Sequence, residues 1–293
     1  MKALAFIGLG EAGIAFATGL DADHPRPRAI DLKTRDPALR SAKLIQAAQA
    51  GVDIHDSPEE ALADAQAAIC VVTADQALSA AHSYAGALEP DALWLDMNSV
   101  APATKLAAAE VIEAAGARYV DVAVMSPVHP GGRATPLLVG GPHADSAIAL
   151  LQHYGFPKVR KKDGPVGAAS AIKMIRSVMI KGMEALTAEC VIAAREAGVL
   201  DDVIASLDAS PPPKAWRERA DYNLDRMLVH GLRRAAEMEE VVKTLETLGV
   251  EAALTRGTVT RQRALGNLAL PQLPEGLEAK LDAILSAPRR DDA

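Results

Sequence analysis

Short apolar runs alternate with amphipathic stretches through the first half of the chain. The runs carry few polar side chains and end at glycine, proline or aspartate, which is typical of strands that are buried on both faces of a parallel sheet. The stretches between them repeat their apolar positions at helical spacing, as in residues 37–50 and 102–115. We therefore expect an open, doubly wound α/β domain of the Rossmann type. Its strands are predicted at residues 3–8, 28–31, 67–73, 92–96 and 118–122, with edge strands at 136–140 and 157–160.

The pattern changes after the last of these strands. Residues 166–197 form one uninterrupted helical pattern, and Gly198 follows it directly, where glycine suits a helix C-cap. Further helical segments come next, and no further strand is expected. The sequence thus predicts two domains, a Rossmann-type domain over residues 1–163 and an all-α C-terminal domain over residues 164–293.

Composition and charge exclude several classes of protein. Hydrophobic residues make up 49% and charged residues 24% of the chain, as in globular proteins. The net charge of -7 argues against a nucleic-acid partner, and no stretch reaches the roughly 20 apolar residues of a membrane span. The N-terminus lacks the pattern of a signal peptide, so we expect a cytoplasmic protein. Cys70 and Cys190 are interpreted as buried thiols, and no histidine spacing predicts a metal site.

A glycine-rich turn follows the first predicted strand. Residues 8–13 read G-L-G-E-A-G, which fits the G-x-G-x-x-G fingerprint of dinucleotide-binding βαβ units. There the first glycine makes a tight turn, the second lets the backbone approach the pyrophosphate, and the third allows close packing of helix on strand. The pyrophosphate is favoured because free N–H groups and the helix dipole point at it. Asp31 closes the second predicted strand, where an acidic residue contacts the adenosine ribose.

The choice between NAD and NADP stays open. Asp31 can accept hydrogen bonds from both ribose hydroxyls, which favours NAD. Lys33 and Arg35 follow at once and could pair with a 2′-phosphate, which favours NADP, or they are solvated loop charges. The residues expected to bind the cofactor are Gly8, Leu9, Gly10, Glu11, Ala12, Gly13, Asp31, Lys33, Arg35, Thr73, Ala74, Asn98 and Ser99.

Four motifs in the same order resemble those of the β-hydroxyacid dehydrogenase family, the relatives of 6-phosphogluconate and 3-hydroxyisobutyrate dehydrogenases. Residues 8–15 resemble its N-terminal signature, and residues 96–102 (D-M-N-S-V-A-P) are similar to its D-x-S-T-x-x-P turn. Residues 121–127 stand where the family has D-A-P-V-S-G-G, and residues 167–173 correspond to G-x-G-x-x-x-K. Residues 230–238 resemble a branch whose C-terminal domain is known as a domain of unknown function.

The resemblance implies an NAD(P)-dependent oxidoreductase that transfers a hydride between the nicotinamide and a hydroxy acid-like alcohol or its carbonyl product. Lys173 holds the position of the family's general acid/base, which takes the hydroxyl proton in oxidation and returns it in reduction. Ser177 stands where the family has an asparagine, so the expected catalytic residues are Lys173 and Ser177. The resemblance also implies a homodimer that forms through the helical domain.

Departures from the family pattern fall at the expected substrate site. Met125 stands in place of the clamp serine, and Pro127 offers no N–H to a substrate carboxylate. A second glycine pair after His129 could rebuild part of an anion site. In the C-terminal half, Arg234 and its neighbours are either a substrate-binding cluster or a solvated set of ion pairs. The residues expected at the small-molecule substrate are Ser126, Pro127, His129, Gly132, Arg234 and Glu237.

Two other functions remain compatible with the sequence. The first is an imine reductase, which would use the same architecture on C=N bonds, although the retained Lys173 speaks against it. The second is a dinucleotide-binding protein without catalysis, which the altered clamp and the serine at position 177 would permit. The sequence leaves the substrate, the pathway and the stereochemistry open.

Overall fold

The structure, a computed structural model, describes residues 3–20, 24–210 and 215–287, apart from the side chains of four residues on the long helices. Contacts divide the chain into two compact units, Met1–Val178 and Met179–Ala293. This division falls within helix α7, Ala168–Glu196. The domain boundary predicted at residue 163 lies just before that helix, and the assignment of two domains remains a prediction.

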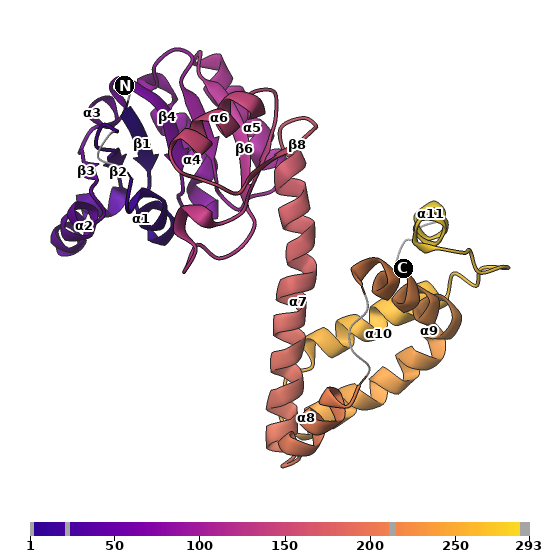
Figure 1. Ribbon diagram of the computed structural model, residues 1–293. Helices are drawn as coiled ribbons and strands as arrows, with labels where there is room; N and C mark the ends of the chain where they lie inside the picture. Colours follow the sequence, from indigo (N-terminus) through magenta and orange to yellow (C-terminus); the bar gives the residue numbers. More distant parts are fainter. Residues whose placement is uncertain (1–2, 21–23, 211–214, 288–293) are drawn as a thin grey trace. The chain divides into compact units, whose positions relative to one another are not determined.

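The first unit is built on one eight-stranded sheet, which Figure 1 shows with helices around it. The strand order is β3-β2-β1-β4-β5-β6-β7-β8, and every neighbouring pair is parallel except β6 and β7. The predicted Rossmann-type α/β class is therefore confirmed. The strands are β1 Ala3–Ile7, β2 Arg28–Ile30, β3 Asp53–Ile54, β4 Ala65–Cys70, β5 Leu93–Asp96, β6 Arg118–Val124, β7 Leu137–Gly140 and β8 Val159–Lys162.

Two details of the sheet differ from the prediction. Strand β3 was not expected, because two residues with a polar Asp53 give no apolar run. Strand β7 was expected at an edge, but it pairs with β6 on one side and with β8 on the other. Its fully buried sequence fits this inner position, and β8 alone ends that side of the sheet.

Side chains alternate between two apolar layers because successive residues of a strand face opposite sides. In β1, Leu4 and Phe6 pack into one layer, whereas Ala5 and Ile7 pack into the other. Helices α1 Glu11–Ala17, α2 Pro37–Gln49 and α6 Ala144–His153 contribute to the first layer, and α3 Pro58–Leu62, α4 Ala77–Tyr84 and α5 Pro102–Ala114 to the second. Four 3-10 turns complete the unit: η1 Leu32–Arg35, η2 Ala74–Gln76, η3 Ala85–Ala87 and η4 Gly132–Ala134.

The strand order reverses beside β1, since β2 lies on one side of it and β4 on the other. The two connections leave β1 and β4 in opposite directions at this point, which opens a crevice at the carboxyl ends of the strands. Ligands of open α/β sheets bind in such a crevice. The topology therefore places the glycine turn after β1 where a ligand is expected.

The second unit contains only helices within the described ranges: α8 Leu200–Asp208, α9 Trp216–Thr247, α10 Ala253–Gly266 and α11 Leu277–Ser286, together with the later part of α7. Helices α9 and α10 touch through their backbones at Gly231 and Gly266. The buried ammonium of Lys280 on α11 lies 2.7 Å from both Asp221 and Asp225 on α9. No helix in the described part of the chain is long and apolar enough to cross a bilayer.

The two cysteines differ in their surroundings. Cys70, at the end of β4, is fully buried as predicted. Cys190, on α7, is exposed, so its interpretation as a buried thiol was wrong. Its apolar sequence neighbours suggested burial, but they lie on a helix that leaves several apolar side chains exposed.

Candidate functional site

The glycine turn between β1 and α1 has a different steric requirement at each glycine. Gly8 has φ +85°, and a Cβ there would lie 2.9 Å from the Val71 carbonyl oxygen. A Cβ on Gly13 would lie 2.7 Å from the Gly8 carbonyl oxygen, so Gly13 allows α1 to pack on the turn. At Gly10 no atom lies within 4 Å of such a Cβ. The backbone at Gly10 is therefore open to a ligand, as a pyrophosphate at a helix N-terminus requires.

A cavity of about 460 Å³ lies over the carboxyl ends of β1, β2 and β4. Seven of the residues predicted for the cofactor line it, namely Gly8, Gly10, Glu11, Asp31, Lys33, Arg35 and Thr73. Leu9 and Gly13 do not line it, because Leu9 is fully buried and Gly13 packs against the turn. The cavity thus joins the glycine turn to the end of β2, as a dinucleotide site requires.

Asp31 ties the end of β2 to the glycine turn. Its Oδ2 accepts a hydrogen bond from the Leu9 N–H at 2.8 Å, and its Oδ1 accepts one from the Lys33 N–H at 2.9 Å. Lys43 donates to the Leu9 carbonyl oxygen at 2.9 Å, and its Nζ lies 3.9 Å from Asp31 Oδ2. The carboxylate is buried, so these contacts fix it while Lys33 and Arg35 border the same cavity.

Helix α4 supplies part of this cavity that the sequence did not reveal. Ser79, Ser83 and Tyr84 also line the cavity. Burial raises the pKa of the Tyr84 phenol, and the nearby Arg35 works in the opposite direction. Ser79 and Ser83 stand four residues apart, so their shared helix face could have been read as a polar stripe.

A second cavity, of about 420 Å³, adjoins the first and shares Glu11, Val71 and Val72 with it. It brings together residues that lie far apart in the sequence. Those predicted for the cofactor, the substrate or catalysis are Glu11, Ala12, Ala74, Asn98, Ser99, Ser126, Pro127 and Lys173. All four family motifs therefore contribute to one cavity on the first unit, the fourth of them through Lys173 near the start of α7.

Lys173 contacts the turn that follows β5. Its Nζ donates a hydrogen bond to Ser99 Oγ at 2.5 Å. The Ser177 hydroxyl, one turn further on, donates to the Lys173 carbonyl oxygen at 2.9 Å. Arg176, which sequence reasoning missed, donates from its guanidinium to the Met125 carbonyl oxygen at 3.4 Å. Its spacing of three residues from Lys173 was the available signal, because such residues share a helix face.

Hydrogen bonds to Asp96, at the end of β5, hold the turn that carries Ser99. Asn98 donates to Asp96 Oδ1 through its backbone N–H at 2.9 Å and through Nδ2 at 2.8 Å. Asn98 Nδ2 also lies 3.3 Å from Cys70 Sγ. Burial, with Asp96 nearby, raises the pKa of the Cys70 thiol to about 12. Cys70 is therefore a packed thiol beneath the site and not a nucleophile.

The remaining predicted substrate residues are not gathered around the second cavity. His129 Nε2 lies 3.9 Å from Glu11 Oε1, beside the glycine turn. Gly132 begins η4 and does not line the cavity. Arg234 lies on α9 of the second unit, and its role remains a prediction. The side chain of Glu237 lies outside the described residues.

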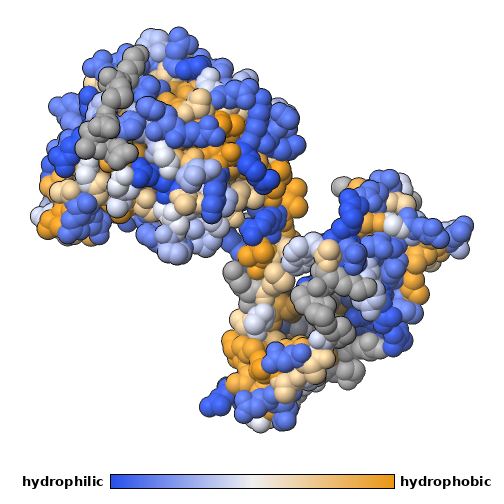
Figure 2. Space-filling view, in the orientation of Figure 1, coloured by the Kyte–Doolittle hydropathy of each residue, from blue (hydrophilic) through white to orange (hydrophobic). Residues whose placement is uncertain are grey.

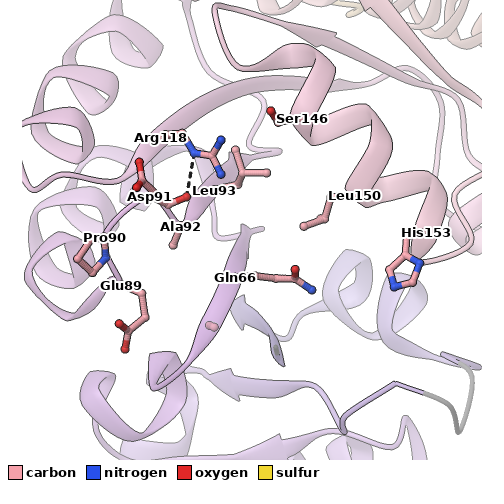
Figure 3. A pocket seen from close by; sticks show the side chains of 11 residues that line it. Gln66, Glu89, Pro90, Asp91, Ala92, Leu93, Arg118, Ser146, Leu150 and His153 are labelled. Atoms are coloured by element: carbon pink, nitrogen blue, oxygen red, sulfur yellow. Dashed lines mark hydrogen bonds between the residues drawn. The ribbon is translucent and has the colours of Figure 1, made fainter. Parts of the chain in front are cut away.

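A third cavity, of about 490 Å³, lies at the amino ends of β4, β5 and β6, the opposite edge of the sheet. Figure 3 shows Glu89 and Asp91 there, together with Arg118, whose Nε donates to the Asp91 carbonyl oxygen. It holds no glycine turn and none of the predicted residues. Two carboxylates beside one guanidinium do not favour a pyrophosphate, so this cavity fits the cofactor less well than the carboxyl-end cavities do.

Comparisons with known proteins agree with this geometry. Residues 3–155 match the family described as the NAD binding domain of 6-phosphogluconate dehydrogenase, and residues 194–265 match a domain of unknown function, DUF1932. The chain is 34% identical to a conserved hypothetical protein from Sinorhizobium meliloti, with 97% of this chain and 96% of that chain covered and a TM-score of 0.60.

Two further solved structures are similar. A conserved protein of unknown function, described as structurally similar to 3-hydroxyacid dehydrogenases, is 28% identical, with 90% of this chain and 96% of that chain covered and a TM-score of 0.57. An imine reductase from Myxococcus stipitatus in complex with NADP+ is 18% identical, with 89% and 93% covered and a TM-score of 0.71, so it shares the fold. With the glycine turn, the strand order and the match over residues 3–155, the chain belongs to the 6-phosphogluconate dehydrogenase-like family of NAD-binding dehydrogenases.

Proposed function

We propose that the chain transfers a hydride between a nicotinamide dinucleotide and an alcohol or carbonyl substrate, with Lys173 as the general acid/base. The observation that carries the proposal is the position of the Lys173 ammonium. It lies at the wall of the second cavity, bonded to Ser99 Oγ, and this cavity adjoins the one that holds the glycine turn. This position beside the proposed cofactor cleft supports a role for Lys173 in proton transfer, which alcohol oxidation requires.

Each group at the site has a role in this proposal. The bound nicotinamide supplies or accepts the hydride. The glycine turn holds the pyrophosphate, and Asp31 fixes the turn against β2. Lys173 accepts the hydroxyl proton during oxidation and donates a proton to the carbonyl oxygen during reduction. Ser99 orients Lys173 Nζ through the observed hydrogen bond. The hydroxyl of Ser177 is bonded to its own helix, which supports a part in shaping the helix.

The second cavity supports a substrate with one polar end. Met97, Val124 and Val128 give it apolar walls, whereas Ser126 and Lys173 are polar. Pro127 has no N–H to donate, so a substrate carboxylate would need a cation. Arg176 is a cation beside this loop, since its guanidinium donates to the Met125 carbonyl oxygen. We therefore propose a small hydroxy acid-like substrate or its oxo form.

The test has two stages. NADH and NADPH are first titrated against the full chain by fluorescence, which decides between Asp31 and the pair Lys33 and Arg35. Hydroxy acids, simple alcohols and their carbonyl products are then screened with the preferred cofactor. Turnover of at least one compound supports the proposal, and cofactor binding without any turnover supports the alternative of a dinucleotide-binding protein without catalysis.

Imine reduction is the second candidate. Relatives of the same fold are imine reductases, and the loss of the clamp serine at Met125 with the proline at 127 favours a substrate that lacks a carboxylate. Cyclic imines belong in the same screen. Faster turnover of cyclic imines than of any hydroxy acid, unchanged in Lys173→Ala, would favour this function over alcohol oxidation.

We also propose that the chain forms a homodimer. Helix α7 leaves large apolar side chains exposed, and Figure 2 shows apolar surface along it. Ile175 and Val178 are 72% and 75% exposed, whereas most apolar side chains of this size are buried in a protein core. An apolar helix face of this kind favours a partner surface of the same chemistry, such as α7 of a second copy. Sedimentation of the full chain as a monomer at micromolar concentration would contradict the dimer.

A further inference from the structure

Two aspartates that open sequence motifs lie side by side inside the first unit. Asp96 ends β5 and Asp121 lies opposite it in β6, and both are at most 1% exposed. Lys105 on α5 is fully buried between them. Its Nζ lies 2.9 Å from Asp96 Oδ1 and 3.7 Å from Asp121 Oδ1, and it donates to the Asp96 carbonyl oxygen at 2.6 Å. None of the three lines either cofactor cavity, so any part in the reaction must act through other residues.

Asp121 holds the first turn of α7. Its Oδ2 accepts hydrogen bonds from the N–H groups of Gly167, Ala169 and Ser170 at 3.0, 3.1 and 3.1 Å. Its Oδ1 accepts another from the Ser170 hydroxyl at 2.5 Å. Two carboxylates and one ammonium leave this cluster with one excess negative charge. The partial positive charge at the N-terminus of α7 offsets it. Lys173 lies one turn beyond this anchor, so a side chain of the sheet fixes the origin of its helix.

Asp96 holds the other half of the catalytic contact. Its Oδ1 accepts both hydrogen bonds from Asn98, the residue before Ser99. Its Oδ2 accepts a hydrogen bond from the Tyr119 hydroxyl at 2.6 Å. Burial, together with the Asp96 carboxylate, raises the pKa of Tyr119, so the phenol remains a donor at any working pH. The turn that presents Ser99 to Lys173 is thereby fixed to β5.

We propose that Asp96 and Asp121, joined through Lys105, are positioning residues that set the separation of Ser99 and Lys173. The two aspartates face each other on neighbouring strands, and each holds one partner of the Lys173–Ser99 contact. Charged groups this deeply buried persist only with partners, and here the partners are the elements that carry the site. The role in catalysis rests on the proposed function of Lys173, whereas the anchoring itself does not.

The test of the anchoring needs no substrate. The full chain is acetylated with trace acetic anhydride. Mass spectrometry then gives the ratio of acetylation at Lys173 to acetylation at the exposed Lys158 of the same unit. Lys173 must leave Ser99 Oγ to react, so a looser anchor raises its relative rate. We expect Asp121→Asn to raise the ratio about fivefold, the scale of one lost hydrogen bond. Ser170→Ala, a milder change at the same anchor, raises it less and serves if Asp121→Asn fails to fold.

Asp145→Asn is the matched control, because it removes an exposed carboxylate paired with Lys161 on the same unit. This variant leaves the Lys173 ratio unchanged. A ratio that stays at the wild-type value in both Asp121→Asn and Ser170→Ala would overturn the proposal.

With a substrate in hand, a second readout separates positioning from general stability. Asp121→Asn lowers kcat about tenfold or more, because a small misplacement of a reacting group has a large effect on rate. The Kd for the reduced cofactor stays at the wild-type value. A lowered kcat with an equally weakened Kd would show a general structural role and would contradict positioning. If wild type turns over nothing, the proposed function fails, and the acetylation ratio still decides the anchoring.

Discussion

Gly10 offers a substitution that separates cofactor binding from folding. Its φ of -75° and ψ of -159° are accessible to alanine, and no atom lies within 4 Å of the Cβ that alanine would add. Gly10 is the N-cap of α1, where alanine costs about 0.5–1 kcal/mol relative to glycine. The lower entropy of the unfolded chain offsets this by about 0.4–1 kcal/mol. Gly10→Ala should therefore leave the free energy of unfolding nearly unchanged.

Cofactor affinity should respond differently. In the proposed site the pyrophosphate approaches the backbone in the open space above Gly10, and a methyl group there would overfill the contact. Overpacking of one methyl costs about 1–3 kcal/mol, which corresponds to a roughly 5- to 150-fold rise in Kd. Fluorescence titration with NADH and NADPH measures the Kd, and urea denaturation measures the stability.

Two other glycines make matched controls for this experiment. Gly86 also has no atom within 4 Å of an added Cβ and lies outside both cofactor cavities, so Gly86→Ala should change neither quantity. Gly13→Ala should lower stability as well as affinity, because its Cβ would lie 2.7 Å from the Gly8 carbonyl oxygen. Wild-type Kd in Gly10→Ala would refute the assignment of the pyrophosphate to this turn.

Three further predictions concern the rest of the molecule. Gly231→Ala should destabilise the second unit by about 1–3 kcal/mol or more in thermal unfolding, because its Cβ would strike the α10 backbone; an unchanged Tm would contradict the close helix contact. Although burial opposes it, hydrogen bonds from Thr255 and the first N–H groups of α10 lower the pKa of Glu189. The stabilisation that this carboxylate gives the folded state is thus present above the unfolded pKa of about 4.3 and is lost as the pH falls through the lower folded pKa. Glu189→Gln should therefore lower the free energy of unfolding at pH 7 and hardly change it in strong acid. Iodoacetamide at pH 8 should spare Cys70 in the native protein, because this thiol is buried and its pKa is raised to about 12, and should label it after unfolding in urea; labelling of Cys70 in the native protein would contradict the burial.

The sheet was predictable because its signals are local. Apolar runs closed by glycine or aspartate marked most of the strands, and their alternation with helices gave the fold class. Strand β3 was not predicted, because its two residues, Asp53 and Ile54, are too few to form an apolar run. The inner position of β7 was not predicted, because the order of strands in a sheet depends on which strands pair in the folded chain. The antiparallel pairing of β7 with β6 leaves no pattern in the local sequence.

The site was predictable to the extent that its residues lie in motifs. Asp31 and Lys173 were predicted in that way, and each lines one of the two carboxyl-end cavities. Tyr84 and Arg176 were missed because only the orientation of a helix decides which of its faces meets the cavity. Lys105 was missed because a lysine in an amphipathic helix is ordinarily solvated, and only the folded chain shows it buried between two carboxylates.

The central claim is that Lys173 is the acid/base of a hydride transfer. The most direct measurement compares kcat of wild type, Lys173→Ala and Lys181→Ala, a lysine on the same helix, with the first substrate that the screen provides. We predict a fall of about 10²- to 10⁴-fold in Lys173→Ala with the cofactor Kd unchanged, and wild-type kcat in Lys181→Ala. Full activity in Lys173→Ala would contradict the account.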